Sequence, residues 1–352
     1  MQLDACDYEL PPELIAQQPA RVRDRARLLL LDRARDTLTH ARVRDLVDLL
    51  TPQDVLVIND TKVFPARLLG KRRGSGGNVE FLLVRREGPR CWRALVKPSH
   101  RLAVGAEVVF EEHGWIGVVG ERDAWGMRCV EFRGLGRIRT WLARCGRVPL
   151  PPYIKPLDGG DTRTPPRGIN HQRRYQTVYA RHLGSVAAPT AGLHFTRSML
   201  GRLQAKGVEV YPITLHVGPG TFRPIRTDVV EAHSMDAEQY WITPDVARSI
   251  DACKAGGKRL IAVGTTTARA LESAAGHHGR MLHLEGEATL FIYPGYRFKV
   301  VDGLLTNFHL PRSTPLLLVM ALAGRAPTLA AYRTAIVRQY RFYSYGDAML
   351  IV

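Results

Sequence analysis

From about residue 185 onward, apolar runs alternate with amphipathic stretches. The runs at 208–217, 259–264 and 303–308 are typical of buried strands, whereas 196–207 and 265–275 have the apolar spacing of helices. A strand followed by a helix and another strand is the repeating unit of a parallel sheet. We therefore predict an α/β domain whose sheet is largely parallel.

Other segments fit the same domain. Further strands are predicted at four places, namely 55–60, 185–189, 289–293 and 348–352. The stretch 327–340 has the period of an amphipathic helix, with Pro327 in its first turn. The apolar run from Pro315 to Gly324 predicts a buried helix.

Residues 62–148 have a different pattern, in which short β-rich segments are separated by glycine turns. Five or six such strands at close spacing predict a small antiparallel β-barrel. Because a strand precedes the segment and the βα units follow it, we predict that it is inserted into a discontinuous α/β domain of residues 1–61 and 149–352. It holds 18 Lys and Arg against 8 Asp and Glu, a net charge of +10, which makes it a candidate surface for nucleic acid.

The whole chain is strongly basic, with a net charge of +17 and a pI near 10.1. Such a field attracts polyanions, and nucleic acid is the commonest polyanion in the cytosol. A high-GC genome that favours arginine in general would leave the same composition. Composition alone does not separate these two explanations.

The cysteines and the apolar runs bear on the compartment. Five cysteines are scattered without a CxxC pair or a Cys/His cluster, which indicates reduced thiols and no metal site. The longest charge-free apolar stretch, between Arg312 and Arg325, is too short to span a bilayer, and the acidic N-terminus lacks a signal-peptide core. We therefore expect a cytoplasmic protein with no membrane contact. No exposed heptad or edge motif requires a dimer, so we expect a monomer.

Candidate chemistry lies in the loops after the predicted strands, because ligands of open parallel sheets bind beyond the carboxyl ends of the strands. His194 and His216 are predicted to end consecutive strands of one βαβ unit, which would bring them close together for catalysis or substrate binding. A structural role is the alternative for each. The other candidate positions in these loops are Asn59, Asp60, Thr190, Gly192, Gly218, Gly220, Thr221, Arg223, Gly264, Thr265, Thr266, Thr267, Asn307, His309, Tyr345 and Asp347.

Several of these positions allow two interpretations. Residues 264–267 open a helix after a strand, where free amides and the helix dipole would bind an anion, or where Thr is an ordinary N-cap. Gly218 and Gly220 would allow a ligand to approach the backbone, or they merely form a tight turn at Pro219. The aromatic rings of 340–345 would stack on a purine, but core packing is expected for at least two of them.

Longer motifs carry a family resemblance. The chain resembles the S-adenosylmethionine:tRNA ribosyltransferase-isomerase family of queuosine biosynthesis in motifs that keep their order, among them VLVINDTKVFPARL, VAAPTAGLHFT, ITLHVGPGTFRPI, IAVGTTTARALES, VDGLLTNFHLPRSTPLLLVMALAG and YRFYSYGDAMLI. The resemblance extends from DYELPPELIAQQPA near the N-terminus to the last residues. Asp236, where members carry His, and the 157–172 loop depart from the family pattern.

The resemblance implies a reaction and its substrates. Members transfer the ribosyl group of S-adenosylmethionine onto 7-aminomethyl-7-deazaguanine at the wobble position of tRNA. They rearrange it to an epoxycyclopentanediol, which gives epoxyqueuosine-tRNA, and they release adenine and methionine. S-adenosylmethionine is then a consumed co-substrate, and no metal or other cofactor is expected.

The same resemblance implies roles for acid and base groups. A base must remove a C5′ proton next to the sulfonium, and histidine suits this step because its unperturbed pKa of about 6.5 lies near the working pH. We expect His194 or His216 to be that base, or the acid that protonates the departing adenine. Asp60 and Asp347 would orient an imidazole or bind ribose hydroxyls.

Binding roles follow in the same way. Arg223 and the amides of Thr265 to Thr267 would hold the methionine carboxylate, for which a bidentate guanidinium is well suited. The tRNA is expected to contact the 62–148 domain, where phosphates would meet the excess of positive charge. Further expected tRNA contacts are Lys155, Arg163, Arg167, Arg173 and Arg174.

Two other functions fit parts of the sequence. An S-adenosylmethionine-dependent RNA methyltransferase shares the α/β class, but such enzymes place a glycine-rich loop after the first strand, and VLVIND here leads to TKVFP. A non-catalytic RNA-binding module would use the barrel alone, and the two histidines would be superfluous for it. Release of adenine and methionine, without methyl transfer to RNA, separates the expected enzyme from both.

Overall fold

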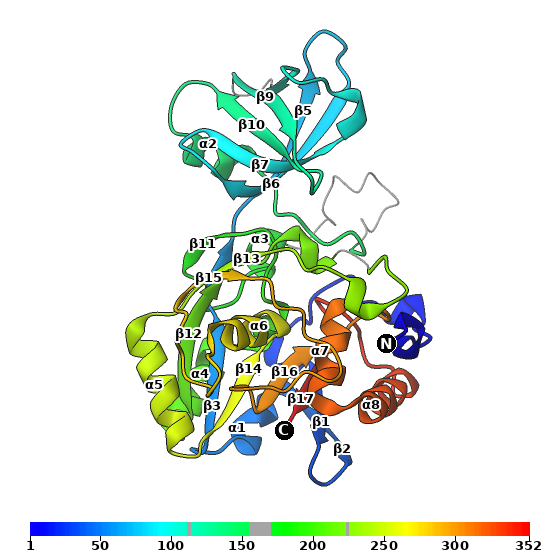
Figure 1. Ribbon diagram of the computed structural model, residues 1–352, viewed down its shortest axis with the longest axis vertical. Coiled ribbons are helices and arrows are strands. Elements are labelled where there is room, and N and C mark those ends of the chain that lie inside the picture. Colours follow the sequence, from blue (N-terminus) through cyan, green and yellow to red (C-terminus); the bar gives the residue numbers. More distant parts are fainter. Residues whose placement is uncertain (111–113, 155–169, 223–224) are drawn as a thin grey trace.

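The computed structural model describes residues 1–110, 114–154, 170–222 and 225–352. A small β-barrel stands apart from a larger α/β domain (Figure 1). Strand β3 (Asp54–Asn59) of the larger sheet continues through β4 (Thr61–Val63) into the barrel. The carboxyl ends of the strands parallel to β3 therefore point toward the barrel.

The larger sheet has nine strands within the described residues, in the order β15-β13-β12-β3-β14-β16-β17-β1-β2. Its central strands β12, β3, β14 and β16 are parallel, as predicted, and β17 is parallel to β1. The other four pairings are antiparallel, so the sheet is mixed and is parallel mainly at its centre. The remaining bounds are β1 (Arg27–Asp32), β2 (Thr37–Arg42), β12 (Glu209–Leu215), β13 (Glu238–Trp241), β14 (Arg259–Val263), β15 (Glu285–Ala288), β16 (Gly303–Asn307) and β17 (Ala348–Ile351).

Alternate side chains of the central strands face two separate cores. Leu56 and Ile58 pack with helices α1 (Leu46–Leu49) and α4 (Arg197–Ala205) on one face of the sheet. Val57 belongs to the core on the other face, which is covered by helices α5 (Pro244–Ala255), α6 (Thr265–Ala274), α7 (Thr314–Ala323) and α8 (Arg325–Val337). Strand β3 is buried at every position, which explains its continuous apolar sequence.

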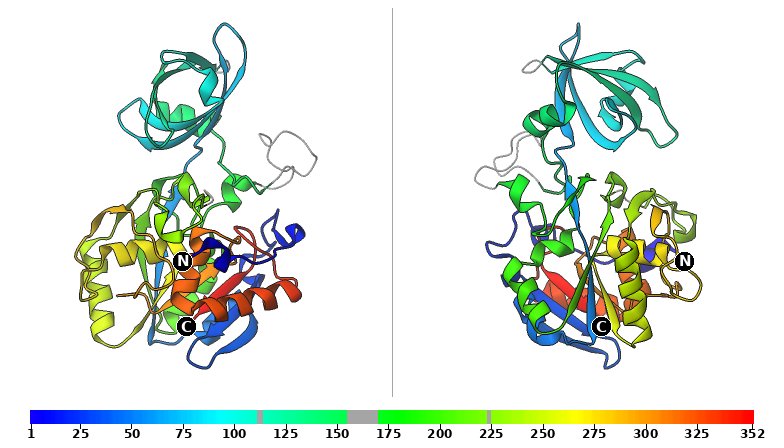
Figure 2. Two further views of the ribbon diagram at one scale, coloured as in Figure 1. Left: turned by 45° about the vertical axis from the view of Figure 1, so that its right-hand side comes forward. Right: turned by 90° about the vertical axis from the view of Figure 1, so that its left-hand side faces the viewer.

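The predicted barrel is confirmed, and Figure 2 shows its ring of strands nearly end-on in the left view. Its strands are β5 (Arg67–Arg72), β6 (Asn78–Arg86), β7 (Cys91–Lys97), β8 (Glu107–Phe110), β9 (Trp115–Arg122) and β10 (Arg128–Arg133). Helix α2 (Ile138–Cys145) was not predicted, although Ile138, Trp141 and Leu142 have helical spacing and are buried. The Trp141 ring stacks on Trp115 with 4.8 Å between centroids, so α2 is part of the barrel core.

Two segments join the barrel to the α/β domain. On the way in, β4 pairs with β11 (His182–Ser185), a strand outside the larger sheet. Where the chain enters and leaves the barrel, the backbones of Arg67 and Arg147 exchange two hydrogen bonds (3.0 and 2.8 Å). A side chain at Gly146 would collide with the Pro65 carbonyl oxygen, so glycine allows the two connecting segments to lie side by side.

Two predicted strands do not form, although the structure describes both segments. The 289–293 stretch lies beyond the end of β15, and the carbonyl of Leu290 accepts a hydrogen bond from the Arg269 guanidinium (3.1 Å), as does the carbonyl of Ala288 at the end of β15 (2.8 Å). The 185–189 stretch follows β11, and the Ser185 hydroxyl binds the Ala187 carbonyl (2.7 Å) as the chain turns into the 3-10 helix η6 (Thr190–His194). In both places, side-chain hydrogen bonds to the backbone replaced strand pairing.

Short helices account for much of the remaining chain. The two helices predicted after residue 314 both form, as α7 and α8, and Gly324 with φ +86° lies between them as the C-cap of the first and the N-cap of the second. Among the described residues no single helix is long and apolar enough to cross a membrane, and these two meet at a bend of 116°. The other short helices are α3 (His171–Arg174) and 3-10 helices at Leu3–Cys6, Pro12–Leu14, Arg23–Arg25, Val43–Asp45, Ser99–Arg101, Pro219–Phe222 and Val230–Ala232.

The Glu272 side chain on α6 holds the connection between β15 and β16 in place. Its carboxylate accepts hydrogen bonds from the Tyr296 hydroxyl and from the backbone N–H groups of residues 299–301, at 2.9 to 3.1 Å. We expect Glu272→Ala to lower the free energy of unfolding by about 3 kcal/mol, because buried donors lose their acceptor. Urea denaturation measures this. The matched control is Glu285→Ala at an exposed site, which should change the free energy by less than about 0.5 kcal/mol, and equal midpoints for the two variants would contradict the assignment.

Candidate functional site

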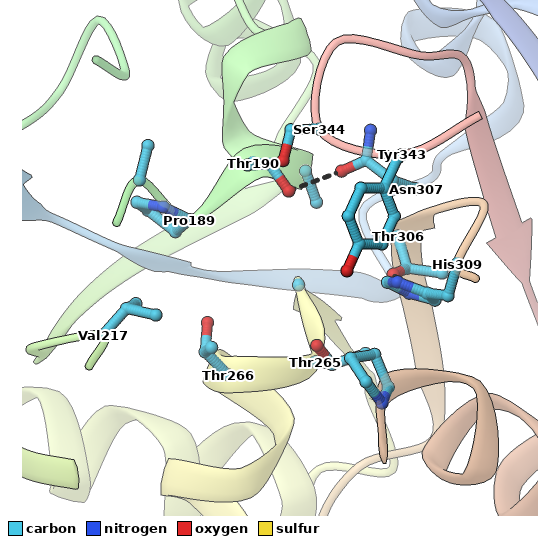
Figure 3. Close-up of a pocket in the computed structure, with 14 residues that line it drawn as sticks. Pro189, Thr190, Val217, Thr265, Thr266, Thr306, Asn307, His309, Tyr343 and Ser344 are labelled. Carbon is cyan, nitrogen blue, oxygen red and sulfur yellow. Dashed lines mark hydrogen bonds between the residues drawn. The ribbon is translucent and has the colours of Figure 1, made fainter. Parts of the chain in front are cut away.

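A cavity lies at the carboxyl edge of the central strands. Figure 3 shows the first turn of α6 on one side of it, with Thr190, Asn307 and Tyr343 across from Thr266. Its lining residues are Ala188, Pro189, Thr190, Ala191, Val217, Gly264, Thr265, Thr266, Thr306, Asn307, His309, Pro315, Tyr343 and Ser344. The structure thus brings together six of the predicted positions, namely Thr190, Gly264, Thr265, Thr266, Asn307 and His309.

The first turn of α6 presents unpaired polar groups to the cavity. Gly264 is the N-cap, with φ +96°, and no side chain caps the helix, so the interpretation of a threonine N-cap is wrong. The first backbone N–H groups of a helix have no partner within it. The Thr267 hydroxyl donates back to the Val263 carbonyl (2.7 Å), whereas the hydroxyls of Thr265 and Thr266, only 9% and 7% exposed, have no hydrogen-bond partner among the described residues. This turn is suited to an anionic or polar ligand group.

Asn307 connects the cavity to His194. Its side-chain oxygen accepts a hydrogen bond from the Thr190 hydroxyl (2.9 Å). Its amide nitrogen donates to His194 Nε2 (3.1 Å) and to the carbonyl of Asp347 (3.4 Å). Because a carbonyl can only accept, the Asp347 contact determines which way the amide points and makes His194 Nε2 an acceptor.

His194 is a neutral imidazole. Burial lowers its pKa to about 4, partly opposed by the nearby Asp347 carboxylate. With Nε2 accepting from Asn307, the ring proton belongs on Nδ1. His194 lies in η6 and not at the end of a sheet strand as predicted, and it does not itself line the cavity.

His309 is the histidine that lines the cavity. Its Nε2 is 2.7 Å from the Thr306 hydroxyl, and its backbone N–H donates to the Tyr332 hydroxyl (3.1 Å). Burial lowers its pKa to about 3, so the ring is neutral near pH 7. If Nε2 carries the proton and donates to Thr306, the lone pair of Nδ1 is left to accept a proton.

His216 and Asp60 form a separate group. His216 follows β12 as predicted, but its Nδ1 is bonded to the Thr61 hydroxyl (2.7 Å) and its ring meets Trp241 edge-on at 5.1 Å. Asp60 accepts a hydrogen bond from the Thr214 hydroxyl (2.6 Å) and lies 3.5 Å from His182. Burial lowers the pKa of His216 to about 4. No hydrogen bond joins His216 to His194 among the described residues. The prediction that these histidines end consecutive strands of one βαβ unit is wrong, because only β12, which precedes His216, belongs to the larger sheet.

Two predicted site residues are engaged in the scaffold. The Asn59 side chain, fully buried, makes hydrogen bonds to both the N–H and the carbonyl of Leu215 (3.0 and 2.9 Å), which holds β12 against β3. The Asp347 carboxylate accepts from the backbone N–H groups of Arg27 and Arg341 (2.9 and 2.8 Å) and from the Arg27 guanidinium. Neither has a free polar atom aimed at the cavity.

The remaining predicted positions differ in their surroundings. A side chain at Gly192 would collide with the Tyr179 hydroxyl, and one at Gly220 would collide with the Asp236 carboxylate, so both glycines are required for packing. The N–H of Gly218 donates to the Glu238 carboxylate (3.0 Å). Arg223 and the side chain of Thr221 lie outside the described residues.

An inner passage leads from His194 to the surface. It is lined by Pro19, Ala20, Arg23, Arg174, Leu193, His194, Ser344, Tyr345 and Gly346. Ser344 also lines the cavity, so the two spaces adjoin. The predicted Tyr345 is buried here, and its hydroxyl is 2.9 Å from His171 Nδ1.

The passage opens into a wide surface cleft of about 1280 Å³, which we call the arginine cleft. It is lined by Gln18, Pro19, Ala20, Arg21, Arg23, Lys62, Asn170, Arg173, Arg174, Gln176, Thr177, Val178, Ala180, Arg197 and Arg341. Seven of these fifteen residues are Lys or Arg, and none is Asp or Glu. Sequence reasoning found only Arg173 and Arg174, because the other basic residues come from separate parts of the chain and form no local run.

Sequence reasoning also missed cavity residues. Thr306 and Ser344 line the cavity and were not among the predicted site residues, whereas Tyr343 was expected as one of the rings that would stack on a purine. Their proximity to recognised positions was the available signal, since Thr306 precedes Asn307 and Ser344 precedes Tyr345. All four rings at Tyr340, Phe342, Tyr343 and Tyr345 are buried, so core packing dominates in this run.

One group of side chains has the composition of a metal site. Glu87, Cys91 and Cys129 in the barrel offer ligand atoms that lie within 4.8 Å of one another. The two sulfur atoms are 2.9 Å apart, closer than the roughly 3.8 Å between two thiolates on a tetrahedral zinc ion. Burial raises the pKa of the Cys91 thiol to about 12, which disfavours the thiolate that a metal needs.

Comparisons with known proteins cover the whole chain. Residues 3–351 match the model of a family described as queuosine biosynthesis protein. An S-adenosylmethionine:tRNA ribosyltransferase-isomerase of Pelotomaculum thermopropionicum is 50% identical over 352 residues, and one of Symbiobacterium thermophilum is 49% identical over 353 residues, each with 100% of both chains covered. The crystal structure of S-adenosylmethionine tRNA ribosyltransferase from Thermotoga maritima is 35% identical, covers 99% of this chain and 100% of its own, and has a TM-score of 0.55.

The buried histidines predict a pH dependence of stability. In the folded protein the pKa of His194, His216 and His309 is lowered to between about 3 and 4, whereas in the unfolded chain each binds a proton below about 6.5. The unfolded state then holds more protons, so the free energy of unfolding should fall as the pH drops from 6.5 toward 4. We expect His309→Asn, which cannot titrate, to reduce this slope in urea titrations between pH 7 and 5. The exposed His277→Asn serves as control, and an equal slope in both variants would refute the assignment.

Proposed function

The chain belongs to the S-adenosylmethionine:tRNA ribosyltransferase-isomerase family of queuosine biosynthesis, and we propose that it catalyses that reaction. It transfers the ribosyl group of S-adenosylmethionine to 7-aminomethyl-7-deazaguanine at the tRNA wobble position. It then isomerises the product to epoxyqueuosine-tRNA and releases adenine and methionine. The observation that carries the proposal is 50% identity to a relative of that name over 100% of both chains.

The cavity is the site proposed for S-adenosylmethionine. The uncapped first turn of α6 supplies backbone N–H groups and the free hydroxyls of Thr265 and Thr266, which suit the methionine carboxylate. The cavity measures about 50 Å³, well below the roughly 300 Å³ at the small end of ligand pockets. Binding therefore requires the lining segments to separate, and the 343–344 loop and η6 are the segments that face α6 (Figure 3). Arg223 keeps its proposed role at the carboxylate.

The role of general base in proton transfer is assigned to the histidine that lines the cavity. His309 lines it, and its low pKa ensures the unprotonated form that a general base needs, at the cost of basicity. His194 acts through Asn307, whose position it determines by accepting the amide hydrogen bond. His216 is bonded to Thr61 away from the cavity lining, so its contribution is to packing between β12 and β4. Asp347 supports His194 electrostatically.

The tRNA is proposed to approach from the side of the barrel, toward which the carboxyl ends of the parallel strands point. The barrel segment supplies ten of the seventeen net positive charges. Arg173 and Arg174 lie on α3 between the barrel and the inner passage, whereas Lys155, Arg163 and Arg167 lie outside the described residues. We place the reaction in the cytoplasm, where tRNA is available, and no disulfide joins any of the five cysteines, in agreement with a reducing compartment.

The fate of labelled S-adenosylmethionine tests the function. With methyl-labelled co-substrate and tRNA that carries the deazaguanine, we expect the label to leave as methionine and adenine to appear in equal amount. Omission of that tRNA should abolish adenine release. Label retained in the RNA would indicate a methyltransferase, and no adenine release with the complete mixture would indicate a binding module.

Histidine variants test the assignment of proton transfer. We expect His309→Asn to lower the rate of epoxyqueuosine formation by about 10² or more, because general acid–base catalysis typically contributes that much. His194→Asn should lower it through misplacement of Asn307, and Asn307→Ala should have a similar effect. His216→Asn should retain the rate within about tenfold. Circular dichroism establishes folding, and a near-wild-type rate for His309→Asn would refute its role.

A further inference from the structure

The arginine cleft concentrates positive charge that no carboxylate balances. Its seven Lys and Arg side chains form no ion pair with any carboxylate among the described residues, whereas many other arginines in the chain do. Burial, together with the proximity of Arg174, lowers the pKa of the Arg23 guanidinium. Like charges held together in this way oppose folding, which points to a polyanionic partner.

The inner guanidinium groups are held in place by the backbone. Arg23 donates to the carbonyl of Leu193 (2.9 Å), Arg341 donates to the carbonyls of Gln18 and Tyr345 (3.2 and 2.8 Å), and Arg174 donates to Ala20. Carbonyl oxygens orient a guanidinium without cancelling its charge. The outer side chains of Arg21, Lys62, Arg173 and Arg197 are exposed and make no hydrogen bond within the described residues. The cleft therefore has a rigid inner wall and an adaptable outer rim.

A second observation in the cleft also calls for a ligand. Thr177 lines it, is only 6% exposed, and its hydroxyl has no hydrogen-bond partner in the described structure. Buried polar groups without partners are rare, and a ligand hydroxyl or phosphate oxygen would satisfy this one.

The cleft, the inner passage of about 20 Å³ and the cavity share lining residues. Pro19, Ala20, Arg23 and Arg174 line both the cleft and the inner passage, which ends at His194. Ser344 then lines both the passage and the cavity. The Arg23 guanidinium donates to the carbonyl of Leu193 (2.9 Å), so a group bound at Arg23 lies next to the residue that precedes His194, the histidine that accepts from Asn307.

We propose that the arginine cleft binds the sugar–phosphate backbone of the anticodon loop and directs the wobble base along the inner passage, while S-adenosylmethionine occupies the cavity at the opposite end. This inference rests on the proposed function and adds the location of the RNA. Recognition by phosphate contacts fits a single-stranded loop, whose bases can turn outward. The barrel then supplements binding to the rest of the tRNA.

Two arginines of one helix provide a matched test. Arg197 at the start of α4 lines the cleft, whereas Arg202 on the same helix does not, and both are exposed. We expect Arg197→Gln combined with Arg173→Gln to weaken binding of a synthetic anticodon stem-loop about tenfold or more. The slope of log affinity against log salt should also fall, by roughly 0.7 to 0.9 for each charge removed. Arg202→Gln should leave both quantities close to wild type, and S-adenosylmethionine binding should be unchanged in all variants.

Other outcomes separate this inference from the proposed function. If Arg202→Gln weakens binding as much as Arg197→Gln does, the cleft is not the RNA site. The same conclusion follows if the cleft variants bind the stem-loop as tightly as wild type does. In either case the proposed function stands as long as wild type releases adenine. A larger loss for the barrel variant Arg139→Gln/Arg144→Gln also overturns the inference, because it places the RNA on α2. If wild type neither binds the stem-loop nor releases adenine, both proposals fail.

Discussion

The parallel pairing of β12, β3, β14 and β16 is the constraint on which the rest of the structure depends. Four strands that run in one direction deliver four loops to one edge of the sheet, and the cavity is built from three of them. Asn59 holds β12 against β3 at the point where the chain leaves the sheet for the barrel, because its side-chain amide makes hydrogen bonds to both the N–H and the carbonyl of Leu215. The same edge therefore carries the link to the barrel and the candidate site.

The two ends of the site differ in their electrostatics. Around the cavity, burial keeps His194 and His309 neutral, and the unpaired polar groups are hydroxyls and helix N–H groups. In the arginine cleft the charges are positive and unbalanced by carboxylates among the described residues. A small charged co-substrate and a polyanion are best accommodated by such different environments. In the proposed arrangement the inner passage lies between the two ligands.

Sequence patterns predicted the elements whose signal is local. The continuous apolar run of β3, the helical period of α6 and the close-spaced strands of the barrel all require only neighbouring residues to be recognised. The pattern failed at 289–293, where the Leu290 carbonyl accepts a hydrogen bond from the Arg269 guanidinium, remote in sequence, and not from a neighbouring strand. It also failed at η6, where an apolar segment turns at Pro189 instead of extending the sheet.

By itself the sequence determined the α/β class, the inserted barrel, the family resemblance and six of the residues that line the cavity, because strand-end loops can be found from apolar periodicity alone. Only the tertiary structure decided that His216 turns to Thr61, that His194 reaches the cavity through Asn307, and that Lys and Arg residues from five separate segments form one cleft. The direction of a side chain depends on partners far away in the chain. A single hydrogen bond from such a partner outweighs any preference that the local sequence carries.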